Sequence, residues 1–518
     1  MDSFAFQALT PTAFLDRSAH VYPDRPALID GDRHFTYREL HARARRVAGG
    51  LAALGVQQGD RVAVLAPNSH ELLEAHNAVP YAGAALVPLN VRLQPGELAY
   101  MLDHSGAVAL IHDVALAEQA RAAVAGVDRD IHLIQAGGDG DTYEALIDGA
   151  DELTVAVGET DLLSINYTSG TTGRPKGVMY SHRGAYLQAL AMAMQSGMRC
   201  DSVYLWTLPM FHCNGWCFTW GVTAAGATHL CLRQVEGGEI WRLIREHGVS
   251  HLSGAPTVLN MIANDPAAQD GPAPDPVHVD TGGAPPSPTL LATLADLNME
   301  VTHLYGLTES YGPVMICEWQ PDWNDLPHER QADLRARQGV GNVISEQPRV
   351  IDADDADVPA DGATIGEIAL RGNNIMLGYF RDEVATRDAT DTGWFRTGDL
   401  AVMHPNGYVE LRDRKKDVII SGGENIASIE VEQVIASHPD VLEVAVVGQP
   451  DERWGEVPVA FVTVKQDREL TEDAIVAHVR KRIAHFKAPK AVHFGPLPKT
   501  STGKVKKHEL RDTVEAAG

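Results

Sequence analysis

The order of apolar and helix-length segments is the feature that most constrains the fold of this chain. An apolar run at residues 61–66 is followed by a helix-length segment at 71–81 and by a second apolar run at 83–88. The same order returns at residues 249–254 and 256–264. Short buried strands that alternate with helices are typical of parallel sheets with crossover helices on their faces. We therefore predict an α/β fold.

The pattern changes near residue 413, where five consecutive charged residues (413–417) interrupt the alternation. The pentad looks exposed, and an α+β pattern follows it. The elements expected after it are strands at 443–447 and 459–464 and a helix at 472–483. We predict three parts, which are a large N-terminal domain at 1–413, a hinge at 414–417 and a small C-terminal lid domain at 418–518.

Composition excludes several classes of protein. The chain has 518 residues, 44% of them hydrophobic, and a formal net charge of −26, whereas a nucleic-acid-binding protein usually carries a basic face. The sequence contains no apolar run long enough to span a membrane, and neither end resembles a secretory, peroxisomal or prenylation signal. We expect a cytoplasmic protein whose five cysteines are reduced thiols.

A loop rich in glycine and hydroxyl residues follows the apolar run at 162–165. It reads Tyr-Thr-Ser-Gly-Thr-Thr-Gly-Arg-Pro-Lys-Gly at 167–177. Glycines let successive backbone N–H groups turn toward one point, and Lys176 adds a mobile cation. These features favour polyphosphate binding over a flexible linker, although the spacing is not that of a Walker A loop. The loop residues predicted to bind phosphate are Thr168, Ser169, Gly170, Thr171, Thr172 and Lys176.

This loop resembles the signature of the adenylate-forming superfamily, which includes acyl-CoA synthetases, the adenylation domains of peptide synthetases, and luciferases. Further motifs of that superfamily occur in the same order and extend from about residue 30 to residue 507. The resemblance implies an N-terminal domain of βαβ-type subdomains and a small β-barrel, followed by an α+β lid. It also implies that a carboxylic acid reacts with ATP, in the presence of Mg²⁺, to form an acyl-adenylate.

Three later segments are similar to the adenosine-binding motifs of the superfamily. They are Asp-Thr-Gly-Gly-Ala-Pro (280–285), Tyr-Gly-Leu-Thr-Glu (305–309) and Gly-Trp-Phe-Arg-Thr-Gly-Asp (393–399). Alone, each would be an ordinary turn or surface segment. The resemblance implies that Tyr305 stacks on adenine and that Asp399 holds the ribose hydroxyls. The residues that it assigns to ATP or AMP are Gly283, Ala284, Pro285, Tyr305, Gly306, Thr308, Asp399, Arg414 and Lys504, and it assigns Glu309 and Thr168 to the metal.

A basic segment near the C-terminus, Pro-Lys-Thr-Ser-Thr-Gly-Lys (498–504), would alone be a solvated tail. In the superfamily the lysine after Thr-Gly is catalytic, and Lys504 takes that position. Its cation would stabilise the charge that grows when a carboxylate attacks the α-phosphorus of ATP. Lys416 matches the pivot about which the lid rotates. The residues that would then line the passage for coenzyme A are Gly422, Gly423 and Glu424.

The segment Pro-Met-Phe-His-Cys-Asn-Gly-Trp (209–216) matches the superfamily's gate to the acyl pocket. His212 would be the gate, although a lone histidine is often a satisfied core residue. Trp216 is bulky and would shorten the pocket, which predicts a short acid. The residues assigned to the acyl pocket are His212, Trp216, Gly283, Ala284 and Gly306.

Residues 209–216 and 424–430 are most similar to short- and medium-chain acyl-CoA ligases, including methylmercaptopropionate–CoA ligases. The prediction is therefore an ATP-dependent acid–CoA ligase for a monocarboxylate, because the pocket segments carry no lysine or arginine. An adenylating enzyme with another acceptor and a non-catalytic binding protein remain open. The intact set Thr168, Lys176, Glu309, Asp399 and Lys504 favours an enzyme. The sequence leaves the acid open, as well as the choice between a monomer and a homodimer.

Overall fold

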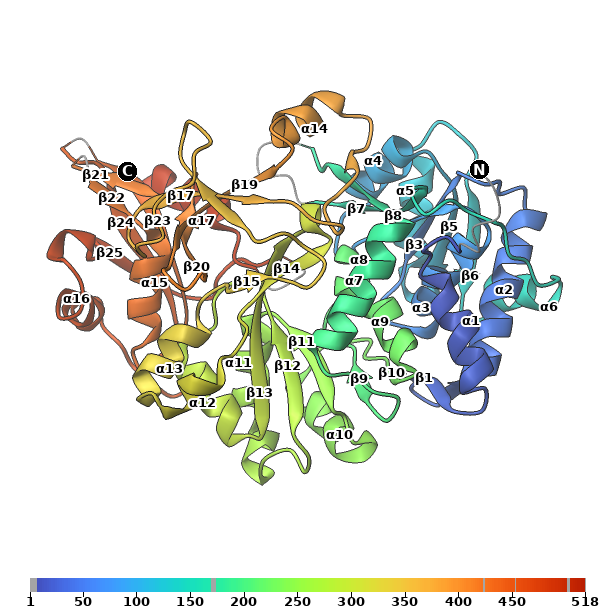
Figure 1. Ribbon diagram of the computed structural model, residues 1–518, viewed down its shortest axis with the longest axis horizontal. Coiled ribbons are helices and arrows are strands. Elements are labelled where there is room, and N and C mark those ends of the chain that lie inside the picture. Colours follow the sequence, from blue (N-terminus) through green and yellow to red (C-terminus); the bar gives the residue numbers. More distant parts are fainter. Residues whose placement is uncertain (1–6, 169–173, 423, 452, 501–503, 518) are drawn as a thin grey trace.

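Four β-sheets form the framework of the part of the chain that the structure describes (Figure 1). The computed structural model describes residues 7–168, 174–422, 424–451, 453–500 and 504–517. No helix in these ranges is long and apolar enough to cross a membrane.

A mixed seven-stranded sheet contains the first predicted strand–helix–strand unit. Its strands, in spatial order, are β18 (Gly378–Tyr379), β8 (Gly177–Ser181), β7 (Leu162–Tyr167), β4 (Ala85–Pro88), β3 (Arg61–Leu65), β5 (Ala107–Asp113) and β6 (His132–Ala136). Helix α3 (His70–Tyr81) connects β3 to the parallel strand β4, and the Ser69 hydroxyl caps its N-terminus. The predicted unit is confirmed.

A nine-stranded sheet contains the second unit. Its strands are β15 (Val340–Gly341), β14 (Gly312–Ile316), β13 (Met299–Leu307), β12 (Val277–Thr281), β11 (His251–Gly254), β9 (Val203–Leu205), β10 (Thr228–Leu230), β1 (Pro26–Asp30) and β2 (Arg33–Thr36). Helix α11 (Pro256–Asn264) follows β11, as predicted. Both large sheets have antiparallel strands at an edge, because β8 returns after β7 and β14 returns after β13. The antiparallel strands β8 and β14 thus come directly after β7 and β13, the two strands that carry the phosphate loop and the adenosine motif.

The remaining two sheets belong to the C-terminal third. An antiparallel sheet stands where the small β-barrel is predicted. Its strands are β16 (Arg349–Ile351), β17 (Ile365–Leu370), β19 (Phe395–Met403) and β20 (Val409–Arg414). In the described residues these strands pair in that order, in one open row. The last sheet holds β22 (Glu424–Ile426), β21 (Ile419–Ser421), β24 (Gly455–Val464), β23 (Val441–Asp451) and β25 (Ala491–Phe494). The helices beside it are α15 (Ser428–Ala436), α16 (Glu472–Arg480) and α17 (Lys507–Ala517). The helix predicted at 472–483 thus ends earlier, at Arg480.

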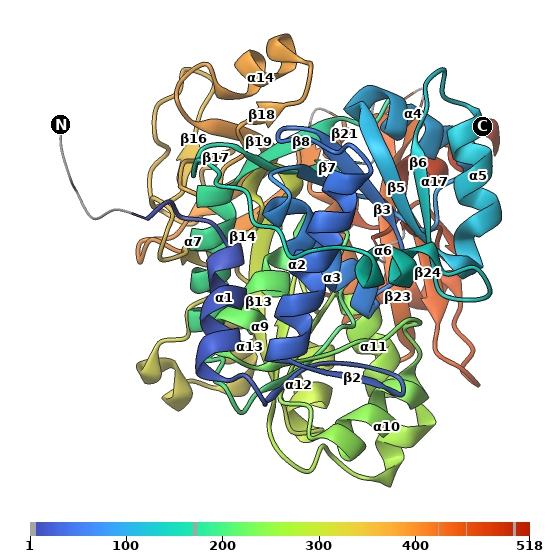
Figure 2. The ribbon, with the colours of Figure 1, turned by 90° about the vertical axis from the view of Figure 1, so that its right-hand side faces the viewer.

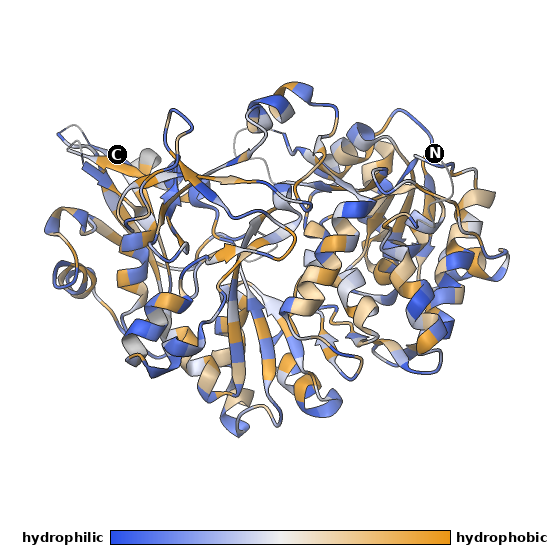
Figure 3. Cartoon of the chain, viewed as in Figure 1, coloured by the Kyte–Doolittle hydropathy of each residue, from blue (hydrophilic) through white to orange (hydrophobic). Residues whose placement is uncertain are grey.

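Helices cover the sheets and close the hydrophobic core. The helices α1 (Thr12–Val21), α2 (Tyr37–Ala53) and α3 pack side by side on the N-terminal flank (Figure 2). Hydrophobic residues concentrate on the strands, whereas the outer helices alternate between hydrophobic and hydrophilic residues (Figure 3). The carboxyl ends of β7 and β13 lie between the N-terminal sheets and the C-terminal sheet, with β14 and β15 near the centre of the view in Figure 1.

Candidate active site

The phosphate loop begins at the end of β7. The Thr168 N–H group donates to the Lys176 carbonyl oxygen at 3.0 Å, which closes the base of the loop. The predicted phosphate ligands Ser169, Gly170, Thr171 and Thr172 lie outside the described residues. The ammonium of Lys176 lies 4.5 Å from the ring centroid of Tyr379.

Tyr379 also contacts the predicted metal ligand. Its hydroxyl group donates to Glu309 Oε1 at 2.8 Å, and Glu309 lies in the short 3₁₀ turn Thr308–Ser310 after β13. One tyrosine from β18 therefore touches both a phosphate-loop cation and a carboxylate. Hard carboxylate oxygens suit Mg²⁺, and Glu309 and Thr168 are the residues that would hold it.

Asp399 connects the adenosine motifs. Its Oδ2 accepts a hydrogen bond from the Tyr305 hydroxyl at 2.7 Å, and its Oδ1 lies 3.5 Å from Arg414 Nε. Asp399 is buried, on β19 beside β20. Burial, followed by the Asp399 charge, raises the pKa of Tyr305, so the phenol stays protonated and acts as a donor. Three residues predicted to bind the nucleotide thus meet at one point.

Lys504 reaches this point from the C-terminal part of the chain. Its N–H group donates to Thr500 Oγ1 at 3.1 Å, and the Thr500 N–H group donates back to the Lys504 carbonyl oxygen at 2.7 Å. Lys504 as a whole residue is exposed. Desolvation of its ammonium, together with repulsion from Arg414 and Lys416, lowers the pKa of Lys504 to about 8. The Asp399 carboxylate opposes this shift.

The predicted gate lies beside the same charges. Burial, with the nearby Lys504 cation, lowers the pKa of His212 to about 4, so its ring is neutral at pH 7. Cys213 Sγ lies 3.8 Å from His212 Nε2 and 3.8 Å from Thr308 Oγ1. Burial raises the pKa of Cys213 to about 12, so its thiol is protonated and is not a nucleophile. The gate segment and the adenosine motif at 305–309 therefore meet where Cys213 contacts Thr308.

Trp216 belongs to the hydrophobic core and also packs against the backbone of two glycines. A Cβ atom at Gly282 would lie 3.2 Å from its Cη2 atom, and one at Gly312 would lie 3.2 Å from its Cδ1 atom. A Cβ atom at Gly306 would lie only 1.9 Å from the Gly312 carbonyl oxygen. Glycines at these positions allow the indole, which is 7% exposed, to lie flush with the adenosine turn and β14. This geometry suits the wall of a short pocket.

The adenosine turn after β12 leaves backbone open to a ligand. Gly283 has φ +86°, with no atom within 4 Å of an added Cβ atom, and both Gly283 and Ala284 are exposed. Pro285 is half-buried. A flat base could approach this turn closely.

The residues predicted to bind coenzyme A lie elsewhere. Gly422 and Glu424 belong to the exposed β21–β22 hairpin, and Gly423 lies outside the described residues. In Figure 1 this hairpin lies at the outer end of the C-terminal part, well away from β7 and β8. The orientation observed here thus brings Lys504 to the site and leaves the hairpin outside it.

The charged pentad is less exposed than its sequence indicates. Lys415 and Lys416 are exposed in a turn between β20 and β21, but Asp413 and Asp417 are buried. Asp417 pairs with Arg511 of α17, while Asp413 Oδ1 accepts from the Ser428 hydroxyl at 3.1 Å. The prediction of a uniformly exposed pentad is wrong, because two carboxylates are needed to anchor the segment on both sides of Lys416.

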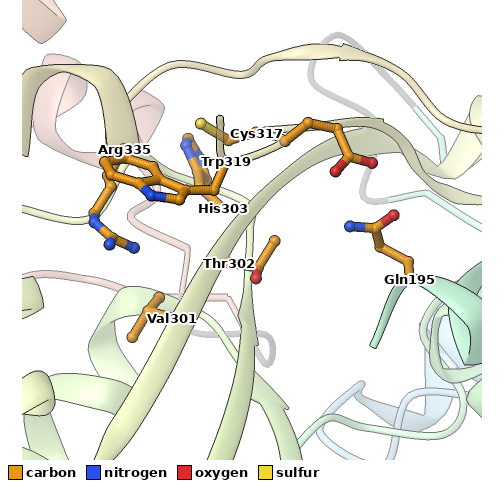
Figure 4. A pocket seen from close by; sticks show the side chains of 8 residues that line it. Gln195, Val301, Thr302, His303, Cys317, Trp319 and Arg335 are labelled. Carbon is orange, nitrogen blue, oxygen red and sulfur yellow. The ribbon is translucent and has the colours of Figure 1, made fainter. Parts of the chain in front are cut away.

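A half-open cavity of about 200 Å³ lies at the edge of β13 (Figure 4). Its lining is Gln195, Val301, Thr302, His303, Cys317, Glu318, Trp319 and Arg335. Arg335 stacks on the Trp319 ring at 3.9 Å, and Figure 4 shows Gln195 on the opposite side of the cavity. The cavity shares β13 with Tyr305 but contains none of the predicted site residues.

A buried group of Asp30, His70 and Glu71 has the residue types of a metal site. His70 Nδ1 lies 2.7 Å from Asp30 Oδ2 and 3.2 Å from Glu71 Oε2. However, Arg33 Nη1 lies 2.8 Å from His70 Nε2, and a guanidinium can only donate. Nε2 therefore accepts, the proton lies on Nδ1, and no lone pair faces the carboxylates. This group is a hydrogen-bonded link between β1 and α3 rather than a metal site.

Two contacts of the site are not marked by any predicted motif. Tyr379 is 70 residues from Glu309 in sequence, and its only signal is a Gly-Tyr pair, which is common in strands. Asn166 precedes the loop and bonds to Asn214, 48 residues away. The only sequence signal for this contact is a polar residue near the end of an apolar strand.

Comparison with known proteins gives the same assignment. Residues 15–380 match the family model described as "AMP-binding enzyme", and residues 430–504 match "AMP-binding enzyme C-terminal domain". The chain is 44% identical to an acetate–CoA ligase, CCL3, from Humulus lupulus, with 99% of this chain and 96% of that protein covered. It is 44% identical, at the same coverage, to the peroxisomal acetate/butyrate–CoA ligase AAE7 from Arabidopsis thaliana.

A solved structure supports the fold at full length. The ATP-bound structure of MatB from Rhodopseudomonas palustris has a TM-score of 0.86 and 28% identity, covering 98% of this chain and 99% of that one. The two family matches leave residues 381–429 between them, so the hinge at 414–417 stays a prediction. The chain belongs to the AMP-binding enzyme family, as an AMP-forming acid–thiol ligase.

Proposed function

We propose that this enzyme joins a short- or medium-chain monocarboxylic acid to coenzyme A in two steps. In the first, a carboxylate oxygen of the acid attacks the α-phosphorus of ATP, and the bond to the bridging oxygen breaks as pyrophosphate leaves. In the second, the sulfur of coenzyme A attacks the acyl carbon, its proton is lost, and AMP leaves. Atoms balance as acid, ATP and coenzyme A against acyl-CoA, AMP and pyrophosphate.

The position of Lys504 carries this proposal. The Lys504 cation of the C-terminal part is coupled electrostatically to Asp399 and Cys213 of the N-terminal part and to Arg414 at the start of the predicted hinge. Such a cation, held where charge develops on the phosphate oxygens, stabilises the transition state of adenylate formation. Magnesium, when bound with ATP, would neutralise the leaving pyrophosphate. With its pKa lowered to about 4, the neutral His212 ring is a weak base, and we assign it the role of a wall.

The wall formed by Trp216 supports a short acid. Its indole fills the space beside Gly282 and Gly312, and the segments 209–216 and 280–285 contain no lysine or arginine that would pair with a second carboxylate. The names of the two relatives above specify acetate and butyrate. We include methylmercaptopropionate among the candidates because of the resemblance at residues 209–216.

The second step requires a different orientation of residues 418–518. We propose rotation at Lys416, which would withdraw Lys504 and bring Gly422, Gly423 and Glu424 toward the adenylate. Asp413 bonds to Ser428 across this turn, so the observed orientation is held by hydrogen bonds that rotation would break. A location in the cytoplasm and the oligomeric state remain predictions.

The test is acyl-CoA formation from a panel of acids. Purified protein is incubated with ATP, Mg²⁺ and coenzyme A, and with acetate, propionate, butyrate, hexanoate, octanoate, methylmercaptopropionate, benzoate or palmitate. AMP and acyl-CoA are then measured by mass spectrometry. We expect equal amounts of both products with acids of two to eight carbons. AMP without acyl-CoA would show another acceptor, and no product with any acid would indicate either a binding protein or an acid outside the panel.

A further inference from the structure

The gate segment adopts a backbone conformation that L-amino acids rarely use in succession. Five consecutive residues have positive φ, with values of +46° at Cys213, +41° at Asn214, +58° at Gly215, +52° at Trp216 and +63° at Cys217. Only one of them is glycine. Left-handed backbone is unfavourable for the others because Cβ approaches the following carbonyl oxygen. Surrounding structure must therefore hold this left-handed turn (residues 213–217) in place.

Two reciprocal hydrogen bonds between Asn166 and Asn214 hold the turn in this conformation. The Asn214 N–H group donates to Asn166 Oδ1 at 2.9 Å, and Asn166 Nδ2 donates to Asn214 Oδ1 at 2.8 Å. Ser164 Oγ donates to the same Asn214 Oδ1 at 3.0 Å. All three residues are at most 2% exposed. Because water cannot compete there, these bonds are strong and directional.

The pair also connects two parts of the active site. Asn166 lies on β7, two residues before Thr168, whose N–H group closes the phosphate loop. Trp216 lies at the other end of the turn, against Gly282 and Gly312. The turn has little room to shift, because a Cβ atom at Gly215 would lie 2.6 Å from Trp206. A change in Asn166 is therefore transmitted to the indole.

We infer that Asn166 is a positioning residue for acid selection. Its pairing with Asn214 holds the left-handed turn, keeps Trp216 against the glycines, and ties the length limit of the acid to the strand that enters the phosphate loop. This inference rests on the proposed function. It predicts that loss of the pair relaxes the preference for short acids while ATP binding changes little.

The experiment compares Asn166→Leu with the control Ser164→Ala. Leucine has a similar volume and cannot form the pair. Alanine at 164 removes only the Ser164 hydroxyl, which donates to Asn214 Oδ1 and accepts from Asn166 Nδ2, and it leaves both hydrogen bonds between Asn166 and Asn214 in place. The probes are acyl-sulfamoyl adenosines with acyl chains of two, four and eight carbons, which resemble the adenylate and do not turn over. Calorimetry gives their dissociation constants, and AMP serves as the reference for the nucleotide site.

We expect Asn166→Leu to lower the ratio of the two-carbon to the eight-carbon affinity by about tenfold or more, with AMP affinity within about threefold. Ser164→Ala should keep the ratio close to that of wild type. A folded Asn166→Leu protein with the wild-type ratio would overturn the inference.

A second variant covers the case in which Asn166→Leu does not fold. Asn166→Ala removes both hydrogen bonds of the pair without adding volume at a buried position, so it should show the same loss of chain-length preference. An unchanged ratio in a folded Asn166→Ala protein would overturn the inference. Failure of the proposed function appears separately, as absence of acyl-CoA from the wild-type enzyme while these binding ratios remain measurable.

Discussion

The acyl side and the lysine side of the active site are built in opposite ways. On the acyl side, Trp216 is 7% exposed and Asn214 is fully buried, and buried amides hold a left-handed turn. On the lysine side, Lys504 is exposed and its backbone is held by two hydrogen bonds to Thr500. The proposed function thus assigns selection of the acid to a fixed wall, and it assigns the charge for chemistry to a part that we propose can rotate away.

Removal of the lysine should produce the largest effect. Lys504→Ala deletes the cation that faces the developing phosphate charge, so we expect acid-dependent ATP–pyrophosphate exchange to fall about 10²- to 10³-fold. Thioester formation from a supplied acyl-adenylate should change little, because that step does not use Lys504. The control is Lys499→Ala. Lys499 lies in the same segment as Lys504 but forms an ion pair with Glu443. Equal loss in both half-reactions would contradict the division of roles.

Enlargement of the acyl side should have the next largest effect. Trp216→Ala removes the wall against Gly282 and Gly312, and we expect the kcat/KM ratio of octanoate to butyrate to rise about 10- to 200-fold. Trp241→Phe, at a tryptophan buried in the core and bonded to Ile262, serves as the control. Better turnover of short acids by Trp216→Ala would show that Trp216 does not limit length.

Tyr379→Phe tests the contact between the two phosphate-side residues. Loss of the hydroxyl removes a hydrogen bond to the Glu309 carboxylate. We therefore expect ATP to bind about tenfold more weakly in the presence of Mg²⁺. Calorimetry with and without Mg²⁺ measures it, and the loss should appear only with Mg²⁺. Tyr204→Phe removes a hydroxyl that bonds to Ser253 instead and should leave both values unchanged. Equal weakening with and without Mg²⁺ would point to a general disturbance.

The smallest effect concerns pH. Desolvation, with Arg414 and Lys416, lowers the pKa of Lys504 to about 8, and only the ammonium form stabilises the phosphate charge. Adenylation kcat/KM should therefore be full below this pH and fall as pH rises through it, by about fourfold between pH 7 and 8.5. Lys504→Arg stays charged, so any activity it retains should not show this decline. The same decline in both proteins would assign it to another group.

The sequence predicts much of this arrangement because its information is local. Alternation of apolar and helical segments predicts the elements of β3, α3, β4 and β11. The resemblance to the adenylate-forming superfamily, and not the motifs taken singly, implies that Tyr305, Asp399, Arg414 and Lys504 serve one site. The structure brings these four residues together.

The contacts between distant segments could not be predicted in this way. Tyr379 with Glu309 and Asn166 with Asn214 are hydrogen bonds between residues far apart in sequence, and such bonds leave no periodic pattern. The left-handed turn has one glycine in five residues, so its composition does not predict left-handed backbone. The buried state of Asp413 and Asp417 depends on α15 and α17, which pack against the segment only in the folded chain.

The most direct test of the separation between the two sides is ATP–pyrophosphate exchange by wild type, Lys504→Ala, Trp216→Ala and the double variant, with butyrate and octanoate. We predict that the octanoate-to-butyrate ratio of the double variant equals that of Trp216→Ala, and that its rate loss equals that of Lys504→Ala, since independent sites add in free energy. If Lys504→Ala alone shifts the ratio as Trp216→Ala does, the lysine takes part in acid selection and the account is wrong.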